Sequence, residues 1–188
     1  MKKIILASTS LQRKEILEKS GIPFIVEASG YVEDMTLPLS PQELVMHLSL
    51  GKADTVARRN RNAIIIGADT VVTIEGKVFG KPYTPEKAKE MLTILNGKQN
   101  TIVTGVTIID TETGRKEFFI DETKVYFKSM SESAIDAYIQ SGEPLDKAGA
   151  YAIQGLGADF IEKIEGDSLN AIGLPLDKVL EIVKSFEI

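Results

Sequence analysis

The stretch Ile64-Ile65-Ile66-Gly67-Ala68-Asp69-Thr70-Val71-Val72 is an apolar run with a single carboxylate inside it. The β-branched residues on both sides of Asp69 are typical of a strand that is buried on both faces of a sheet. An unpaired ionised carboxylate there would cost several kcal/mol. We therefore expect a cation, a metal or a ligand-facing edge to compensate Asp69. The alternative is a tight bend at Gly67-Ala68-Asp69, in which the carboxylate caps backbone N–H groups.

The composition is that of an ordinary globular protein, with 188 residues, 43% hydrophobic and 26% charged. This length allows a sizeable core, and no linker-like segment divides it, so we expect a single domain over residues 1–188. The net charge of −5 argues against broad binding to nucleic acid or to anionic membranes, because both need a basic surface. Any phosphate site must therefore be local.

The chain contains no cysteine, which excludes disulfides, thiol catalysis and thiolate metal sites. The apolar run near the N-terminus stops at Ser8-Thr9-Ser10, so we interpret it as a first strand and not as a signal peptide. No run approaches the roughly 20 apolar residues of a membrane span. Together these features predict a cytoplasmic protein.

Residues 4–6 and 11–20 predict a strand and a helix joined by a small polar turn, with Ser10 as the helix N-cap. Such a junction directs backbone N–H groups and the positive end of the helix dipole at one point, which suits a phosphate. Ser8 would add a hydroxyl donor. Arg13 lies in the first helical turn, where a cation opposes the dipole unless an anion is bound between them. A bound ligand and a solvated arginine explain Arg13 about equally well.

The segment Ser40-Pro41-Gln42-Glu43 combines a capping box with proline at the first helical position, which predicts a helix running to about Arg59. Lys52 falls near the centre of the apolar face of this helix. The lysine either follows the helix surface out to solvent or points inward toward a phosphate cleft. The loop before the helix carries Glu33, an acid of a kind that is usually solvated.

Beyond the opening stretch, residues 73–78 predict a β-hairpin that turns at Glu75-Gly76. The chain then reaches Gly80-Lys81-Pro82, where the proline holds Lys81 extended on a shaped loop. The remaining pattern predicts helices at 84–95, 131–140 and 176–186, strands at 24–28, 101–110 and 115–127, and a strand-like segment at 151–154. Early alternation of strands and helices, followed by clustered strands, predicts an α/β fold with a mixed sheet.

Several of these segments match, in order, the motifs of a known family. They are Ala7-Ser8-Thr9-Ser10 with Arg13, residues 67–72, Gly80-Lys81-Pro82, residues 148–155, and residues 166–176. Over nearly its whole length the chain resembles the Maf-like nucleoside triphosphate pyrophosphatases. The resemblance implies an elongated, twisted mixed β-sheet flanked by helices, with two lobes around a central cleft, similar to the inosine triphosphate pyrophosphatase fold. It also implies a homodimer.

The family hydrolyses a nucleoside triphosphate to the monophosphate and pyrophosphate with a divalent metal cation, Mg²⁺ or a similar ion such as Mn²⁺ or Co²⁺. By resemblance, Asp69 is the general base or the group that orients water and metal, and Glu33 is a second acid on the metal side. The side chains that would hold the phosphates are Ser8, Arg13, Lys52 and Lys81. Water attack at the α-phosphorus needs such charge neutralisation.

Residues 67–70 and 153–155 resemble the branch of the family that acts on dTTP, UTP and related or modified pyrimidine nucleotides. Thr70 and Gln154 are then candidates for reading the base, because an amide pairs with a pyrimidine edge through both a donor and an acceptor. Where the family usually has Ser-Pro-Arg-Arg, this chain has Ser10-Leu11-Gln12-Arg13. Gln12 replaces a cation often implicated in substrate contact, so affinity or base preference can differ here.

Two other functions are consistent with the sequence. A non-catalytic nucleotide-binding regulator of cell division or septum formation, a role also associated with the family, would bind triphosphates without turnover. A purine-directed pyrophosphatase acting on 7-methyl-GTP or inosine triphosphate would keep its substrate ranking in a Gln154→Ala variant.

Overall fold

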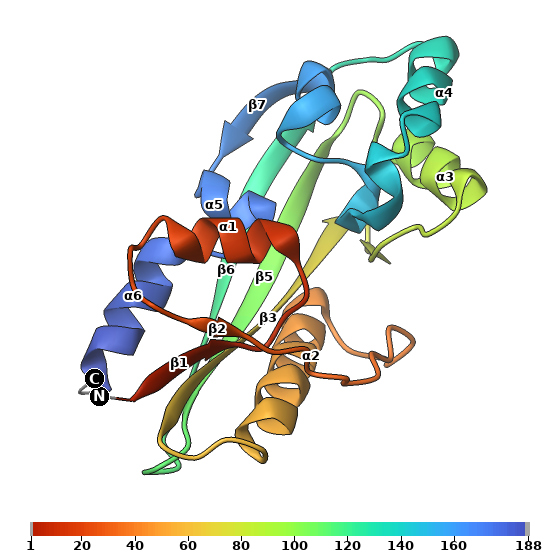
Figure 1. The fold of residues 1–188 in the computed structure, drawn as a ribbon. Coiled ribbons are helices and arrows are strands. Elements are labelled where there is room, and N and C mark those ends of the chain that lie inside the picture. The colour runs from red at the N-terminus through yellow and green to blue at the C-terminus, as the bar shows by residue number, and fades with distance from the viewer. Residues whose placement is uncertain (1, 187–188) are drawn as a thin grey trace.

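The computed structural model describes residues 2–186. Its centre is a seven-stranded sheet of order β2-β1-β3-β5-β6-β7, with β4 paired to β3 outside this path (Figure 1). The strands are β1 (Lys3–Leu6), β2 (Ile25–Val26), β3 (Ala63–Ile74), β4 (Lys77–Phe79), β5 (Gln99–Asp110), β6 (Lys116–Phe127) and β7 (Ile161–Glu165). The pairs β1–β2 and β1–β3 are parallel and the others are antiparallel. The predicted mixed α/β sheet is confirmed.

Helices cover both faces of this sheet. They are α1 (Leu11–Glu18), α2 (Pro41–Ala57), α3 (Pro85–Leu95), α4 (Glu132–Gln140), α5 (Ser168–Ile172) and α6 (Leu176–Ser185), with short 3₁₀ segments η1 (Glu143–Asp146), η2 (Ala148–Ala150) and η3 (Gly155–Phe160). Local signals set the helix starts, since Ser10 caps α1 and Ser40 with Glu43 forms a capping box on α2. Both predicted caps are confirmed.

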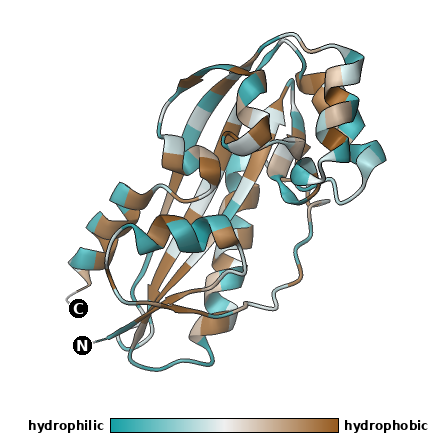
Figure 2. Ribbon diagram, turned by 45° about the horizontal axis from the view of Figure 1, so that its top comes forward, coloured by the Kyte–Doolittle hydropathy of each residue, from teal (hydrophilic) through white to brown (hydrophobic). Residues whose placement is uncertain are grey.

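The side chains of β3 alternate between two different cores. Ile64 and Ile66 pack with residues of α1 and α6 on one face. Ile65 and Val71 face α2 on the other. Figure 2 shows hydrophobic residues along the central strands and mainly hydrophilic residues in α1. Because a strand has a side-chain period of two, Asp69 shares the α2 face with Ile65, and its neighbour Thr70 points the opposite way.

The sheet extends beyond these two cores into a further one. The far ends of β3, β5 and β6 pack against α3 and α4, in a cluster that includes Val72, Leu92 and Phe127. Figure 1 shows α3 and α4 at one end of the elongated sheet and α1, α2 and α6 toward the other. The two lobes expected from the family resemblance are therefore two packed regions on one continuous sheet.

Strand β3 runs straight through the Gly67-Ala68-Asp69 segment, so the alternative of a tight bend there is wrong. Asp69 lies opposite Gly105 in the ladder with β5. Because glycine has no side chain, α2 packs close to the sheet at Gly67 and Gly105. A Cβ on Gly67 would lie 2.5 Å from the Ser49 carbonyl oxygen, and one on Gly105 would lie 2.6 Å from that of Val45. Glycine serves close helix packing here, not a turn.

One edge of β3 is only partly occupied. Strand β1 pairs with it as far as Ile66, and β4 pairs with it from Val72 onward. Between these two, residues 67–71 pair with β5 on one edge and with no described strand on the other. Asp69 sits in the middle of this opening. The Asp69 carboxylate thus lies at a strand edge that a ligand can reach. A ligand-facing edge is one of the three kinds of compensation expected from the sequence.

Two segments differ from the sequence prediction. The strand expected at residues 24–28 is limited to β2, Ile25–Val26. The strand-like residues 151–154 form no strand, because the backbone N–H of Ala152 bonds the Tyr138 hydroxyl and these residues pair with none of the described strands. In the described part of the chain, every helix is too short or too polar to cross a membrane.

Candidate active site

A cavity of about 870 Å³ lies beside the open edge of β3. Its size is in the range of small-molecule and cofactor sites, about 300–1,000 Å³. Segments far apart in the sequence contribute to its walls, from the turn after β1 to the residues around η2. The structure brings all sequence-predicted site residues to this cavity: Ser8, Gln12, Arg13, Glu33, Lys52, Asp69, Thr70, Lys81 and Gln154.

A buried ion pair forms the floor of the cavity. The Lys52 Nζ lies 2.5 Å from Oδ1 of Asp69 and 2.8 Å from Oε1 of Glu33. Asp69 is 5% exposed and Lys52 7% exposed, whereas the Glu33 side chain is 41% exposed. One ammonium group therefore lies within ion-pair distance of two carboxyl groups. Such a floor can bind a cation or stabilise a protonated group.

Burial raises the pKa of the Asp69 carboxyl, although the charges of Lys52 and Arg13 oppose this effect. A carboxylate that holds its proton more tightly than usual is a better acceptor for a proton from water. The strand fixes the carboxylate at the cavity floor, with Lys52 bound to one of its oxygens. Asp69 is thus a candidate for the general base, held at the cavity with a raised pKa.

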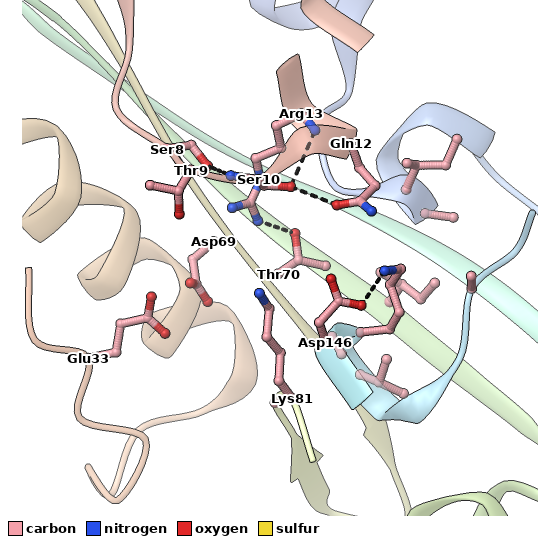
Figure 3. A pocket seen from close by; sticks show the side chains of 18 of the residues that line it. Ser8, Thr9, Ser10, Gln12, Arg13, Glu33, Asp69, Thr70, Lys81 and Asp146 are labelled. Carbon is pink, nitrogen blue, oxygen red and sulfur yellow. Dashed lines mark hydrogen bonds and ion pairs between the residues drawn. The ribbon is translucent and has the colours of Figure 1, made fainter. Parts of the chain in front are cut away.

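Arg13 is held on the other side of β3 by uncharged acceptors. Its Nη2 donates to Oγ1 of Thr70 at 2.9 Å (Figure 3). Its Nε donates to the Gly173 carbonyl, also at 2.9 Å. The Thr70 hydroxyl also bonds Thr104 Oγ1 at 3.0 Å. Burial lowers the pKa of Arg13, with the charges of Asp69 and Glu33 opposing the shift. An arginine keeps its charge in proteins, so Arg13 is a fixed cation, and Asp69 and Glu33 form their ion pairs with Lys52 instead.

The turn between β1 and α1 supplies neutral groups. Ser8 is 7% exposed, and its Oγ accepts the backbone N–H of Ser10 at 3.1 Å, which leaves the hydroxyl hydrogen available for another acceptor. The Ser10 hydroxyl donates to Oε1 of Gln12 at 3.1 Å. Gln12 thus takes part in the cap of α1, at the position where the family motif carries a cation.

Lys81, Asp146 and Lys147 place further charges on the cavity wall. Of these three residues, the sequence predicted only Lys81. Figure 3 shows Lys81 directed toward the side of the cavity that holds Asp69 and Thr70. Asp146 lies on the same wall and forms an ion pair with its neighbour Lys147. Asp146 and Lys147 come directly before residues 148–155, which belong to the family motif. This position in the sequence was the signal that could have identified them as site residues. Gln154 is an exposed part of the wall.

The carboxylates offer only part of a metal site. Within residues 2–186 there is no group of three or more His, Cys, Asp or Glu side chains that could hold a metal ion. Asp69 and Glu33 are both hard oxygen donors, brought together by Lys52. Mg²⁺ is commonly bound by one or two carboxylates together with substrate phosphates. The donor set therefore fits a divalent ion that arrives with a triphosphate.

A family model described as "Maf-like protein" matches residues 3–186. The chain belongs to the Maf-like family. A relative from Bacillus cereus (strain G9842), described as "dTTP/UTP pyrophosphatase", is 46% identical to the Maf-like chain over 188 residues, with 100% of this chain and 97% of the relative covered. One from Bacillus pumilus (strain SAFR-032), with the same description, is 44% identical, with 100% and 98% covered.

Two solved structures are more distantly similar to the Maf-like chain. The Staphylococcus aureus Ham1 protein aligns with a TM-score of 0.46 at 13% identity, over 67% of this chain and 72% of that one. A "nucleoside-triphosphatase / dITP/XTP pyrophosphatase" from Mycobacterium abscessus aligns with a TM-score of 0.43 at 11% identity, over 97% and 93%.

Proposed function

We propose that the protein hydrolyses nucleoside triphosphates to the monophosphate and pyrophosphate, acting on dTTP, UTP and related or modified pyrimidine nucleotides. The observation that carries this proposal is the cavity floor, where Asp69 sits at an open strand edge with Lys52 and Glu33. The cations Arg13 and Lys81 lie on other walls of the same cavity. The descriptions of the Bacillus relatives support the choice of pyrimidine nucleotides.

In this proposal Asp69 orients the attacking water and accepts its proton. Because β3 and Lys52 fix the carboxylate, the water is held in line for attack at the α-phosphorus. Glu33 is the second acid, on a loop that can meet the triphosphate from the cavity mouth. A divalent ion bound by Asp69, Glu33 and phosphate oxygens would neutralise triphosphate charge and lower the pKa of a bound water.

The cations would bind the phosphate chain. Lys52 and Lys81 face the cavity from α2 and from the loop after β4, and Arg13 reaches over β3. Negative charge grows on the leaving pyrophosphate during the reaction, so preorganised cations that contact it there favour the transition state over bound substrate. Ser8 would add a neutral donor through its available hydroxyl hydrogen.

We assign base recognition to the wall that carries Gln154, whose amide offers both a donor and an acceptor. Thr70 remains a sequence-based candidate, although its hydroxyl is used by Arg13 and Thr104. We also propose that the protein works as a cytoplasmic homodimer on free nucleotides, without nucleic acid or membrane. Its net charge of −5 is consistent with this last point.

A substrate panel with product identification tests the proposal. The protein is incubated with Mg²⁺ and dTTP, UTP, 7-methyl-GTP or inosine triphosphate, and the products are separated by ion-exchange chromatography. We expect monophosphate and pyrophosphate, formed fastest from dTTP and UTP. Orthophosphate as the first product would contradict the proposal. Tight binding of all four nucleotides without turnover would favour the non-catalytic regulator, and faster turnover of the two purines would favour the purine-directed enzyme.

A further inference from the structure

One carboxylate holds the loop that carries Gln154. Glu143, in η1, accepts the backbone N–H of Leu156 on Oε2 at 3.1 Å and that of Gly157 on Oε1 at 2.9 Å. Both carboxylate oxygens are thus occupied by the same short segment, residues 152–157. Hydrogen bonds between backbone N–H groups and an ionised carboxylate are about twice as strong as neutral ones. The segment is therefore anchored directly after Gln154.

A second contact anchors the same segment before Gln154. The Tyr138 hydroxyl, from α4, donates to Oε1 of Glu143 at 2.9 Å and accepts the backbone N–H of Ala152 at 3.2 Å. Tyr138 itself is 3% exposed and packs edge-on against Phe160, so the hydroxyl has little freedom. Burial acts to raise the pKa of Glu143, but the hydrogen bonds from the loop and from Tyr138 lower it overall. The anchor is therefore charged at neutral pH.

The loop is shaped to fit closely around this anchor. Gly155 has φ +72°, and a Cβ at this residue would lie 2.5 Å from Oε2 of Glu143. A Cβ on Gly157 would lie 2.3 Å from the Ala152 carbonyl oxygen and 2.6 Å from the Tyr138 hydroxyl. The positive φ at Gly155 and the short distance from a Gly157 Cβ to a backbone oxygen therefore favour glycine at these two positions.

We propose that Glu143 is a positioning residue for base selection, which holds residues 152–157 so that Gln154 presents its amide to the base of the bound nucleotide. This rests on the proposed function and deepens it, because it names the element that would set substrate preference. Glu143 lines the cavity, but both of its oxygens are bound to the loop. It therefore acts through Gln154 and does not contact the reacting phosphates.

The first test is Glu143→Gln, which keeps the length of the side chain and removes its charge. The new amide NH₂ group faces backbone N–H donors, so at least one hydrogen bond is lost. We expect the KM for dTTP to rise about tenfold or more, because displacement of a binding group by about 1 Å can cost up to a hundredfold. We expect kcat to change less than about threefold, which is the signature of lost binding.

Substrate preference separates positioning from a general structural defect. The measured quantity is the ratio of kcat/KM for dTTP to that for GTP. A variant that merely loses folded protein has lower rates for both substrates and an unchanged ratio. We expect Glu143→Gln to lower the ratio and Glu143→Asp, which keeps the charge, to restore part of it. Glu132→Gln is the matched control, since Glu132 is an exposed residue on α4 that pairs with Lys89. It should leave the ratio unchanged.

A double-mutant cycle tests whether Glu143 acts through Gln154. If it does, Glu143→Gln should have no further effect on the ratio in a Gln154→Ala background. Additive effects of the two substitutions, or an unchanged ratio in Glu143→Gln, would overturn the proposal. Circular dichroism and thermal unfolding check folding. If Glu143→Gln does not fold, Tyr138→Phe, which removes only the bridging hydroxyl, takes its place in the cycle with a smaller expected shift.

The failure of the positioning role can be told from failure of the proposed function. If the unmodified protein releases no pyrophosphate from any triphosphate, the proposed function is wrong. The same cycle is then measured as dissociation constants for dTTP and GTP by calorimetry. A non-additive loss of dTTP preference would still support the role of Glu143, and an additive or absent effect would overturn it.

Discussion

The ammonium of Lys52 on α2 lies 2.5 Å from the carboxylate of Asp69 on β3, and the two residues are 7% and 5% exposed. Of the two alternatives for Lys52 in the sequence, the inward orientation is confirmed. The contact depends on how closely α2 packs on the sheet, which the glycines at 67 and 105 permit. Two charges removed from water are costly unless each is paired. The pair therefore accounts for the buried acid that the apolar strand contains.

Replacing Asp69 by Asn should remove turnover and leave the fold intact. Asparagine has the same shape but cannot accept the proton of the attacking water, and a positioned general base contributes about 10²–10⁴-fold to the rate. Pyrophosphate release from dTTP measures the loss, and circular dichroism checks the fold. Asp177→Asn, at an exposed position in the first turn of α6, is the matched control and should retain the full rate. Normal turnover in Asp69→Asn would rule out this role.

Replacing Lys52 by Met should destabilise the protein, because Asp69 and Glu33 lose their shared cation. Urea unfolding should show a loss of about 1–3 kcal/mol, the typical cost of leaving a buried polar group unsatisfied. The raised pKa of Asp69 limits the loss, since the carboxyl can take up a proton. Adding Asp69→Asn to Lys52→Met should recover part of the stability, as expected for residues in direct contact. Simple additivity of the two losses would argue against the pairing.

Replacing Thr70 by Val keeps the shape of the side chain and removes the hydroxyl that accepts from Arg13 and bonds Thr104. A hydrogen bond to a charged group contributes about 1.5–3 kcal/mol. We therefore expect kcat/KM to fall by about tenfold or more, by a similar factor for every triphosphate, because Arg13 loses its orientation. Steady-state kinetics on the substrate panel checks this. A changed ranking of pyrimidines and purines would instead support the base-reading role predicted for Thr70 from the sequence.

Replacing Gly51 by Ala should lower both stability and activity. Alanine normally stabilises a helix interior by about 1 kcal/mol relative to glycine. At Gly51, however, a Cβ would lie 2.3 Å from Cζ of Tyr31, so the ring would have to move and displace the loop that carries Glu33. Thermal unfolding and pyrophosphate release measure the two effects. Tyr31→Phe, which removes only the exposed hydrogen bond to His47, should behave like the unmodified protein. A more stable and fully active Gly51→Ala would contradict this.

Asp110 should make the stability depend on pH in the acid range. Burial raises its pKa, but hydrogen bonds from Lys2, Thr113 and the Glu112 backbone outweigh this and lower it to about 2. A carboxyl whose pKa is lower in the folded state stabilises the fold above its unfolded value of 3.8 and loses this contribution as pH falls toward 2. Asp110→Asn should therefore be less stable at neutral pH, with a difference that shrinks across this window.

Urea unfolding at a series of pH values measures that difference. Asp177→Asn, which alters an exposed acid, is the control and should follow the unmodified protein throughout. A stability difference for Asp110→Asn that does not change with pH would show that the carboxylate charge is not the cause.

Local signals made much of the fold predictable. The starts of α1 and α2 follow from Ser10 and from the capping box of Ser40, which act within one helical turn. The apolar run around Asp69 predicted a buried strand and a compensating partner, and both are found. Lys52 was predictable as a candidate because helical periodicity alone places it on the apolar face. These inferences needed only near neighbours in the chain.

The remaining features depend on contacts between distant segments. The tight-bend alternative at Gly67 was wrong because the glycine makes room for α2. The contacting residues of α2 are more than ten positions earlier in the chain, so the pattern around Gly67 does not indicate this contact. The strand expected at residues 151–154 is absent because the backbone there bonds Tyr138 instead of a neighbouring strand. Nothing in the local pattern marks Glu143 as the anchor of the Gln154 loop. Its partners are 13 and 14 residues away, and the contact exists only once the loop has folded around it.

The alternation of side chains along β3 has a consequence for how this chain can diverge. Asp69 points toward Lys52, and Thr70, one residue later, points toward Arg13. Substitutions can alter either side independently, so the surroundings of Arg13 can change while the Asp69–Lys52 pair is preserved. Inserting or deleting one residue in the stretch 67–69 would exchange the two faces of the strand. The Asp69 side chain would then point toward Arg13, and the Thr70 side chain toward Lys52. Natural variants of this strand should therefore differ in residue identity but not in length.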